Sequence, residues 1–187
     1  MKKKYKICIH AGHNPSGKIA CGASDYLDES TEDRYVTRKV GKLLKKKGFA
    51  VTNCTVNNGR SQNDVLRKIC DKSNAANPDI TISFHFNSAQ HESKSNGKTL
   101  GTEVWLTANK GVKGAMAKDI CAAIAKCGFV NRGVKVTDSL YFLNHTKNPA
   151  ILVEVCFVSD KDDAILYKKK RDKICENIAN AIAKQFK

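Results

Sequence analysis

The sequence lacks the features that mark membrane-spanning, zinc-ribbon and multidomain proteins. No stretch approaches the ~18–20 consecutive apolar residues of a transmembrane helix, and no two cysteines form the Cys-x-x-Cys pair typical of zinc ribbons. Only three of the 187 residues are proline, and no tract rich in proline, glycine or serine interrupts the chain. We therefore expect one domain over residues 1–187, without a separate binding module.

Acidic residues are scarce: 18 stand against 33 lysines and arginines, which gives a net charge of +15. Runs such as Lys45-Lys46-Lys47 and residues 168–171 belong to predicted helices whose apolar stripes lie elsewhere, so they can simply face solvent. A large positive charge also attracts polyanions, whether nucleic acid, a membrane surface or a cell wall. The sequence has no aromatic-rich RNA-binding signature and no zinc-finger spacing, so we expect no nucleic-acid partner.

The first residues and the eight cysteines indicate a chain made in a reducing compartment. Met1-Lys2-Lys3-Lys4 starts like a signal peptide, but the residues that follow are too short and too polar for its apolar core. Most cysteines lie among apolar neighbours, as Cys8 and Cys156 do. We therefore expect small buried thiols and no structural disulfide.

Apolar periodicity predicts alternating strands and helices. Helical spacing joins Val36, Val40 and Leu44 before Gly48, whereas β-branched and aromatic runs indicate strands. We expect strands at residues 5–9, 49–56, 79–86, 101–107, 140–143 and 150–158, and helices at residues 30–47, 64–74, 112–127 and 174–186. This order predicts a single-domain α/β fold with a twisted, mostly parallel sheet of about six strands and helices on both faces.

Three polar side chains fall at or near the ends of predicted strands, where α/β folds bind their ligands. His13 follows the first strand together with His10, and one or both of these loop histidines could bind a metal. His85 interrupts an apolar strand, where it could be a metal ligand or a buried histidine with a purely structural role. Glu154 is the sharpest case, because residues 150–158 are otherwise apolar. A buried carboxylate needs an ion pair, a metal or a catalytic role to offset its desolvation.

A further carboxylate, Glu29, lies at the start of the first predicted helix, where acidic residues also favour the helix dipole. Two histidines and one glutamate match the ligand set of hydrolytic zinc sites, which keep one position open for water. A second glutamate is then free to act as a general base. The sequence therefore predicts a hydrolytic metal site.

Nearly from end to end, the motifs and their order resemble the zinc-dependent N-acetylmuramoyl-L-alanine amidases of phage endolysins and bacterial autolysins. Ala11-Gly12-His13 is similar to the turn that carries the family's first zinc ligand. Ser83-Phe84-His85-Phe86-Asn87 is similar to the family's Ser-x-His-x-Asn segment. The most specific match is Pro-Ala-x-Leu-x-Glu-x-x-Phe, which appears as Pro-Ala-Ile-Leu-Val-Glu-Val-Cys-Phe at residues 149–157.

The resemblance implies one Zn²⁺ ion held by His13, Glu29 and His85, with Glu154 as the catalytic base. Glu32 competes with Glu29 for the ligand position. The implied reaction is cleavage of the amide between N-acetylmuramic acid and the L-alanine of the stem peptide in bacterial peptidoglycan.

The resemblance also implies a substrate groove lined by residues 131–135 and 140–143. At some positions this sequence differs from the family's usual pattern. His10 stands where the family commonly has aspartate, Asp33 replaces the usual asparagine, and residues 90–99 have no diagnostic match. The side chains expected to contact substrate are Asn87, Arg132, Lys135 and Leu143.

Two other function classes stay open. A different zinc exopeptidase or deacetylase would share the metal ligands, but it would not need these motifs in this order. A basic wall-binding or nucleic-acid-binding domain would account for the charge but leave Glu154 unexplained. For an amidase, we expect a monomer that stays in the host cytoplasm until its release to the wall, like an endolysin, or is secreted if a leader has been removed. We expect the basic surface to take the place of a wall-binding module.

Overall fold

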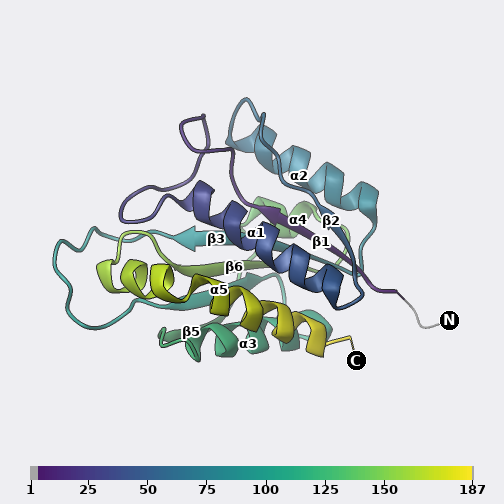
Figure 1. The fold of residues 1–187 in the computed structure, drawn as a ribbon. Helices are drawn as coiled ribbons and strands as arrows, with labels where there is room; N and C mark the ends of the chain where they lie inside the picture. Colours follow the sequence, from purple (N-terminus) through teal and green to yellow (C-terminus); the bar gives the residue numbers. More distant parts are fainter. Residues whose placement is uncertain (1–3, 187) are drawn as a thin grey trace.

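The computed structural model describes residues 4–186, which build a sheet of six strands in the order β2-β1-β3-β6-β4-β5. The elements along the chain are β1 (Lys6–Ala11), α1 (Glu29–Lys46), β2 (Ala50–Asn53), α2 (Gln62–Ala76), β3 (Ile80–Asn87), β4 (Thr102–Leu106), α3 (Gly111–Ala125), β5 (Asn131–Val136), α4 (Tyr141–His145), β6 (Ala150–Phe157) and α5 (Lys161–Lys184) (Figure 1). The first four strands of the sheet are parallel, whereas β4 runs antiparallel to β6 and parallel to β5. The predicted α/β fold with a mostly parallel sheet is confirmed.

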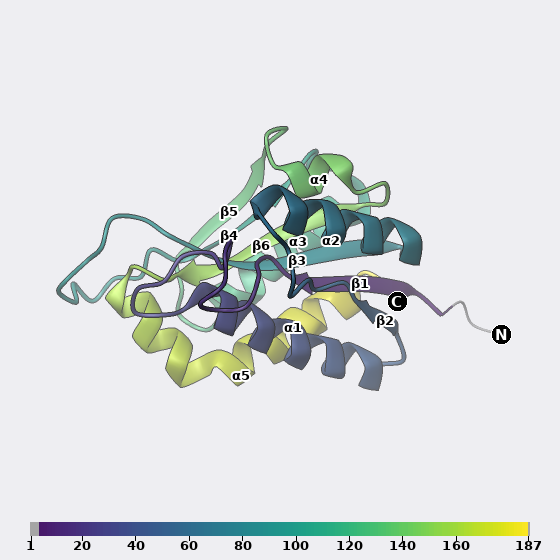
Figure 2. The same ribbon diagram turned by 90° about the horizontal axis from the view of Figure 1, so that it is seen from above.

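Helices cover both faces of the sheet. Figure 2 shows α2 and α4 on one side and α1 and α5 on the other, and α3 packs against α5 on that second side. The larger core lies beneath α1, α3 and α5, and a smaller cluster lies beneath α2 and α4. Because β3 and β6 lie inside the sheet and are covered on both faces, their sequences are almost continuously apolar. Within residues 4–186, no helix combines the length and the apolar character needed to cross a membrane.

Helix α1 fixes the position of the polar site because its first residue is Glu29. Asp28 caps its start, accepting a hydrogen bond from the backbone N–H of Thr31 at 2.8 Å. Gly48 follows the helix end in the left-handed conformation, with φ of +92°. The apolar stripe that packs on the sheet contains Val36, Val40 and Leu44.

The prediction of a strand at residues 140–143 is wrong, because this segment leads into and forms most of the short helix α4. Tyr141 and Phe142 have high strand propensity, but that propensity depends on the packing environment. Phe142 and Leu143 are instead buried in the cluster beneath α2. Thr146 satisfies the helix end, since its Oγ1 donates to the carbonyl of Phe142 at 2.7 Å.

Strand β5 is absent from the predicted strands because it has no apolar alternation. It is an edge strand without buried residues, and Gly133 within it has a φ of +79°. Helix α5 begins at Lys161, directly after its cap Asp160 and well before the predicted start at residue 174. The prediction missed its first turns because they carry many charged residues and no regular apolar stripe.

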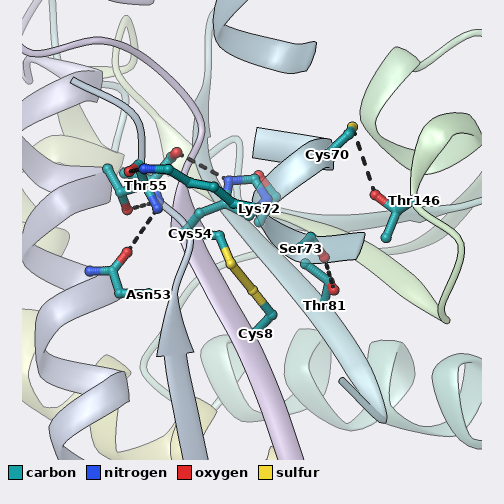
Figure 3. Close-up of a disulfide and its surroundings, with 12 residues drawn as sticks. Cys8, Asn53, Cys54, Thr55, Cys70, Lys72, Ser73, Thr81 and Thr146 are labelled. Carbon is teal, nitrogen blue, oxygen red and sulfur yellow. Dashed lines mark hydrogen bonds between the residues drawn. A yellow bond between two sulfur atoms is a disulfide. The ribbon is translucent and has the colours of Figure 1, made fainter. Parts of the chain in front are cut away.

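A disulfide joins Cys8 of β1 to Cys54, which directly follows β2 (Figure 3). The expectation that all eight cysteines are free thiols is therefore wrong for this pair. Parallel pairing of the two strands brings the Cα atoms of Cys8 and Cys54 to 6.5 Å, a separation that a disulfide can bridge. Apolar sequence neighbours cannot distinguish a buried thiol from a buried half-cystine. The free cysteines are Cys21, Cys70, Cys121, Cys127, Cys156 and Cys175.

Reduction of this disulfide is expected to lower the free energy of unfolding by up to about 4 kcal/mol. The bond joins residues separated by 46 positions, and restricting a loop of that size in the unfolded chain corresponds to about 4 kcal/mol. Urea unfolding with and without a thiol reductant measures the difference. The double variant Cys8→Ala/Cys54→Ala serves as the control, because a reductant should not move its midpoint. A wild-type midpoint that reduction leaves unchanged would contradict the prediction.

Candidate functional site

Several of the polar side chains singled out in the sequence, including His13, Glu29, His85 and Glu154, line one hollow of about 440 Å³. The hollow lies where β1, β3 and β6 end, on the face of the sheet that also carries α2 and α4. Its polar lining comes from His13, Glu29, His85, Asn87, Ser88, Thr137, Ser139 and Glu154. Its apolar lining comes from Ala23, Phe86, Trp105, Leu140 and Leu152.

His13, Glu29 and His85 form a tight cluster in this hollow. Glu29 Oε1 lies 3.1 Å from His13 Nε2 and 3.0 Å from His85 Nδ1, and these two ring nitrogens are 3.1 Å apart. Their side chains are nearly buried, with exposed fractions of 12% for His13, 6% for Glu29 and 13% for His85. The three residues come from the loop after β1, the start of α1 and the end of β3.

The donor set and its spacing fit a divalent metal ion. Zinc–nitrogen and zinc–oxygen bonds of ~2.0–2.1 Å place tetrahedral ligand atoms ~3.3 Å apart, close to the separations in this cluster. When the two ring nitrogens carry no proton, three lone pairs converge here, and a cation between them would remove their mutual repulsion. Burial alone would raise the pKa of Glu29, but hydrogen bonds and charges from His13 and His85 outweigh it and hold that pKa below its usual range. Glu29 therefore stays ionised, as a metal ligand requires.

Backbone groups hold the Glu29 carboxylate in place. Its Oε1 accepts the backbone N–H of Phe86 at 3.1 Å, and its Oε2 accepts that of Ala23 at 2.9 Å. The loop that carries His13 is held from the other side by Arg34, which donates to the carbonyl of His13 at 2.6 Å. Buried Asp33 accepts the backbone N–H of Gly12 at 3.0 Å. The role of Arg34 cannot be read from the sequence, because its position on the helix is equally typical of a residue that faces solvent.

Gly12 is required because the ring of His85 packs directly on its Cα. A Cβ at this position would lie 1.9 Å from Cε1 of His85, closer than any real contact. The substitution Gly12→Ala is therefore expected to displace the His85 ring and to weaken metal binding by at least ~10-fold, a loss of the size that follows when a group orienting a ligand is removed.

Metal titration in competition with a chromophoric chelator measures this effect. Gly48→Ala is the matched control: its positive φ makes alanine unfavourable, but nothing lies within 4 Å of the added Cβ. That variant should lose stability and keep its metal affinity. Equal metal affinities for Gly12→Ala and the wild type would refute the proposed packing constraint.

Glu154 faces the cluster from the neighbouring strand. It lies opposite His85 in the β3–β6 pairing and opposite Glu103 in the β4–β6 pairing. Its Oε2 is buried and has no hydrogen-bond partner among residues 4–186. Burial, together with the negative charges of Glu29 and Glu103, raises the pKa of Glu154 well above its usual value. A carboxyl group whose pKa is raised holds a proton more readily than an ordinary carboxylate does, which suits a group that must take up a proton and release it.

Glu103 organises the wall of the hollow beside Glu154. This buried carboxylate accepts hydrogen bonds from Asn87 Nδ2 at 2.9 Å, Trp105 Nε1 at 3.1 Å and Arg132 Nε at 2.8 Å. Glu103 is absent from the candidate site residues predicted from the sequence. Its position indicated a role, because Glu103 interrupts an apolar strand as Glu154 does.

The two competing ligand candidates point elsewhere. His10 is buried on β1, outside the cluster, and its ring packs edge-on against Phe142. Burial lowers the pKa of His10 to about 3, so the ring is neutral. Glu32 accepts a hydrogen bond from the hydroxyl of Tyr167 at 2.8 Å and so points toward α5. The geometry thus favours His13 over His10 and Glu29 over Glu32.

The four side chains expected to contact substrate lie in different places. Asn87 lines the hollow. Arg132 lies over the ring of Phe157 and pairs with Glu103, which places it beside the hollow. Neither Lys135 on β5 nor Leu143 lines the hollow, and Leu143 is buried beneath α2.

Comparison with known proteins shows the family to which the chain belongs. The profile of the N-acetylmuramoyl-L-alanine amidase family matches residues 7–184. An uncharacterized 38.4 kDa protein of Clostridium perfringens is 39% identical over 181 residues, which cover 96% of this chain and 51% of that protein. The endolysin of Bacillus phage SPP1 is 28% identical over 187 residues, covering 95% of this chain and 64% of the endolysin. The chain thus spans about half to two-thirds of the length of these relatives.

Solved structures share the fold. The catalytic domain of the CD27L endolysin targeting Clostridia difficile superposes with a TM-score of 0.83 at 27% identity, covering 96% of this chain and 97% of that domain. The amidase AmiC2 of Nostoc punctiforme superposes with a TM-score of 0.80 at 20% identity, with 98% of each chain covered. At that lower identity, the second likeness concerns the fold alone.

Proposed function

The chain belongs to the N-acetylmuramoyl-L-alanine amidase family, and from that premise we propose that it cleaves bacterial peptidoglycan at the amide between N-acetylmuramic acid and L-alanine. Hydrolysis breaks the C–N bond, leaves a carboxylate on the lactyl group and frees the amino group of L-alanine. One observation carries the proposal: a half-buried glutamate with a raised pKa faces a His–Glu–His cluster in a single hollow.

We propose that the cluster holds one zinc ion through His13 Nε2, Glu29 and His85 Nδ1. The two imidazoles and one carboxylate match the ligand set of hydrolytic zinc sites. Bound zinc supplies Lewis-acid chemistry, because it lowers the pKa of a water ligand to about 7 and polarises a carbonyl. The backbone N–H groups of Ala23 and Phe86 keep Glu29 oriented toward the two histidines.

Glu154 moves the proton in the proposed reaction. Its unpaired Oε2 would accept a proton from the attacking water and then donate it to the nitrogen of the departing L-alanine. The raised pKa suits both halves of this task, since the group must bind the proton and then give it up. Glu29 performs neither half, because its hydrogen bonds hold it in the ionised form.

The hollow also offers places for the substrate. Trp105, Leu140 and Leu152 give an apolar wall, and Asn87, Thr137 and Ser139 give hydrogen-bonding groups. We propose that these residues contact the sugar and the first residues of the stem peptide. Arg132 would act through Glu103 by fixing the wall beside Glu154.

A soluble N-acetylmuramoyl-peptide tests the metal-dependent part of the proposal. The wild-type chain is expected to release free peptide amines at a steady rate, to lose at least ~10²-fold of that rate in a chelator, and to recover it with added zinc. The chain's absorbance and circular dichroism before and after chelation serve as controls for unfolding. Full hydrolysis by a metal-free sample would overturn the assignment of zinc.

A further inference from the structure

A long basic groove runs between α1 and the edge strand β2, outside the hollow that holds the metal centre. It consists of two hollows of about 610 Å³ and 360 Å³ that share Thr37, Arg38 and Asn53 and are therefore continuous. We call this feature the α1 groove. Its positive side chains are Arg34, Arg38, Lys42, Lys45 and Lys46.

Four cations of the α1 groove are free to bind an external anion. Arg38, Lys42, Lys45 and Lys46 are exposed, and within residues 4–186 their side chains form no ion pair or hydrogen bond. Other cations of the same helix do have partners: Arg34 pairs with Asp33, and Lys39 pairs with Asp172. The charge of the α1 groove is therefore not neutralised within the protein.

The composition of the lining strengthens this charge. In the described part of the chain, no carboxylate lines either hollow. Ile9, Gly41 and Val51 form an apolar floor, and a cleft with walls of one charge above a low-dielectric floor concentrates its electric field. Thr37 is buried to 1% exposure and lines both hollows, and its Oγ1 has no hydrogen-bond partner among residues 4–186.

The spacing of the cations indicates a linear ligand with repeating charge. Arg38, Lys42 and Lys45 lie at helical positions i, i+4 and i+7, so they follow one face of α1. With Lys46 they span about 12 Å along the helix axis. A single phosphate ion would engage one or two of these side chains, whereas a chain with regularly spaced phosphates can engage all of them.

The shape of the α1 groove discriminates among polyanions. No aromatic side chain lines the described hollows, so unpaired bases would find no stacking platform. Proteins that read duplex DNA insert a protruding element into its major groove, and this surface is concave. Binding to a lipid surface usually relies on an apolar face that enters the headgroup layer, and here the apolar residues form the recessed floor.

We propose that the α1 groove binds an anionic, phosphodiester-linked polyol polymer attached to the bacterial wall. The choice of a wall polymer rests on the proposed function, whereas the preference for phosphodiesters rests on the charge and lining of the groove. Its end near Asn57 borders the loop of the metal centre, because Arg34 there donates to the carbonyl of His13. A polymer in the α1 groove therefore holds the hydrolytic site against the wall that carries the polymer.

The test is binding of the intact chain to immobilised poly(glycerol phosphate) over a series of salt concentrations. The triple variant Arg38→Gln/Lys42→Gln/Lys45→Gln is expected to bind at least ~10-fold more weakly at low salt. Its slope of log affinity against log salt should be smaller by about 2, because each phosphate contact on a flexible chain contributes about 0.7.

A matched triple variant removes the same net charge elsewhere. Lys94, Lys118 and Lys169 are exposed and form no ion pair in the described chain, so their replacement by glutamine should leave polymer affinity within ~2–3-fold of the wild type. Thermal unfolding of both triple variants checks that each is folded. Equal losses in the two variants would overturn the proposal, since the binding would then follow net charge alone.

Two further probes distinguish the proposed wall polymer from nucleic acid and from a lipid surface as the ligand of the α1 groove. Single-stranded DNA and vesicles of anionic phospholipid are expected to bind more weakly than poly(glycerol phosphate) and to respond equally to the two triple variants. Stronger binding of either probe through the α1 groove would overturn the choice of polymer. Binding does not depend on hydrolysis, so the outcomes are distinguishable: polymer binding without amide cleavage refutes the proposed function, and cleavage without polymer binding refutes only this inference.

Discussion

Replacing Glu154 by glutamine is expected to lower the rate of amide hydrolysis by about 10²–10⁴-fold while leaving metal content unchanged. This range is the usual contribution of a general acid–base group. Glutamine keeps the size and the hydrogen-bonding capacity of the side chain but cannot carry the proton. Glu154 is not part of the His13, Glu29 and His85 cluster, so the metal should remain bound.

Glu32→Gln is the matched control for Glu154→Gln. Glu32 is a partly buried carboxylate on α1 whose partner is Tyr167, and it does not line the hollow. Initial rates on a soluble N-acetylmuramoyl-peptide and metal analysis of the same samples give both readouts. A Glu154→Gln protein that keeps more than about a tenth of the wild-type rate would rule out Glu154 as the principal proton carrier.

Replacing His85 by alanine is expected to weaken zinc binding by more than about 100-fold and to abolish hydrolysis. Loss of an outer-shell partner alone typically costs about 10–100-fold in metal affinity, so loss of a ligand should cost more. Alanine removes Nδ1 and leaves Glu29 with one histidine neighbour in the cluster. Metal content after dialysis and zinc titration against a competing chelator measure the change.

His91→Ala provides the comparison for His85→Ala. His91 is exposed and pairs with Asp25 at 2.8 Å. The substitution His91→Ala therefore removes an imidazole without changing the His13, Glu29 and His85 cluster. Its zinc stoichiometry should equal that of the wild type. If His85→Ala also kept one zinc ion at wild-type affinity, His85 would be removed from the proposed ligand set.

Where apolar periodicity was strong, the sequence was a reliable guide to the fold. Helix α1 shows a clear stripe and a glycine stop, and β3 and β6 are apolar runs that suit burial on both faces. Helix α4 and strand β5 could not be placed in this way. Helix α4 forms because Phe142 packs against α2, a contact that the local sequence does not show. Strand β5 shows no apolar pattern because it is an edge strand that buries none of its residues.

His85 and Glu154 could be selected from the sequence because each interrupts an apolar strand. His13 and Glu29 fit their local surroundings, a loop and a helix start, and the resemblance to the amidase family singled them out. The residues that hold these side chains in position, such as Gly12 and Arg34, are not marked by any comparable pattern in the sequence. Gly12 matters only because the ring of His85 lies over it, and Arg34 matters only because the chain folds back to place the His13 carbonyl beside it.

Long-range contacts also explain the remaining differences. Cys8 and Cys54 are brought together by the pairing of β1 with β2, which cannot be inferred from their apolar neighbours. The expectation that Arg132 contacts substrate stays a prediction, and its surroundings are also set by long-range contacts. In the folded chain its guanidinium pairs with Glu103 and lies over Phe157, and both partners are distant in sequence.

The amidase assignment is best tested by mass spectrometry of purified Gram-positive peptidoglycan after digestion, with zinc and with a chelator. We expect intact glycan strands and free peptides that begin with L-alanine, and only in the sample with zinc. Cuts within the stem peptide would indicate a peptidase, and loss of acetyl groups would indicate a deacetylase. New reducing sugar ends, or no cleavage of several wall types, would likewise contradict the assignment of an amidase.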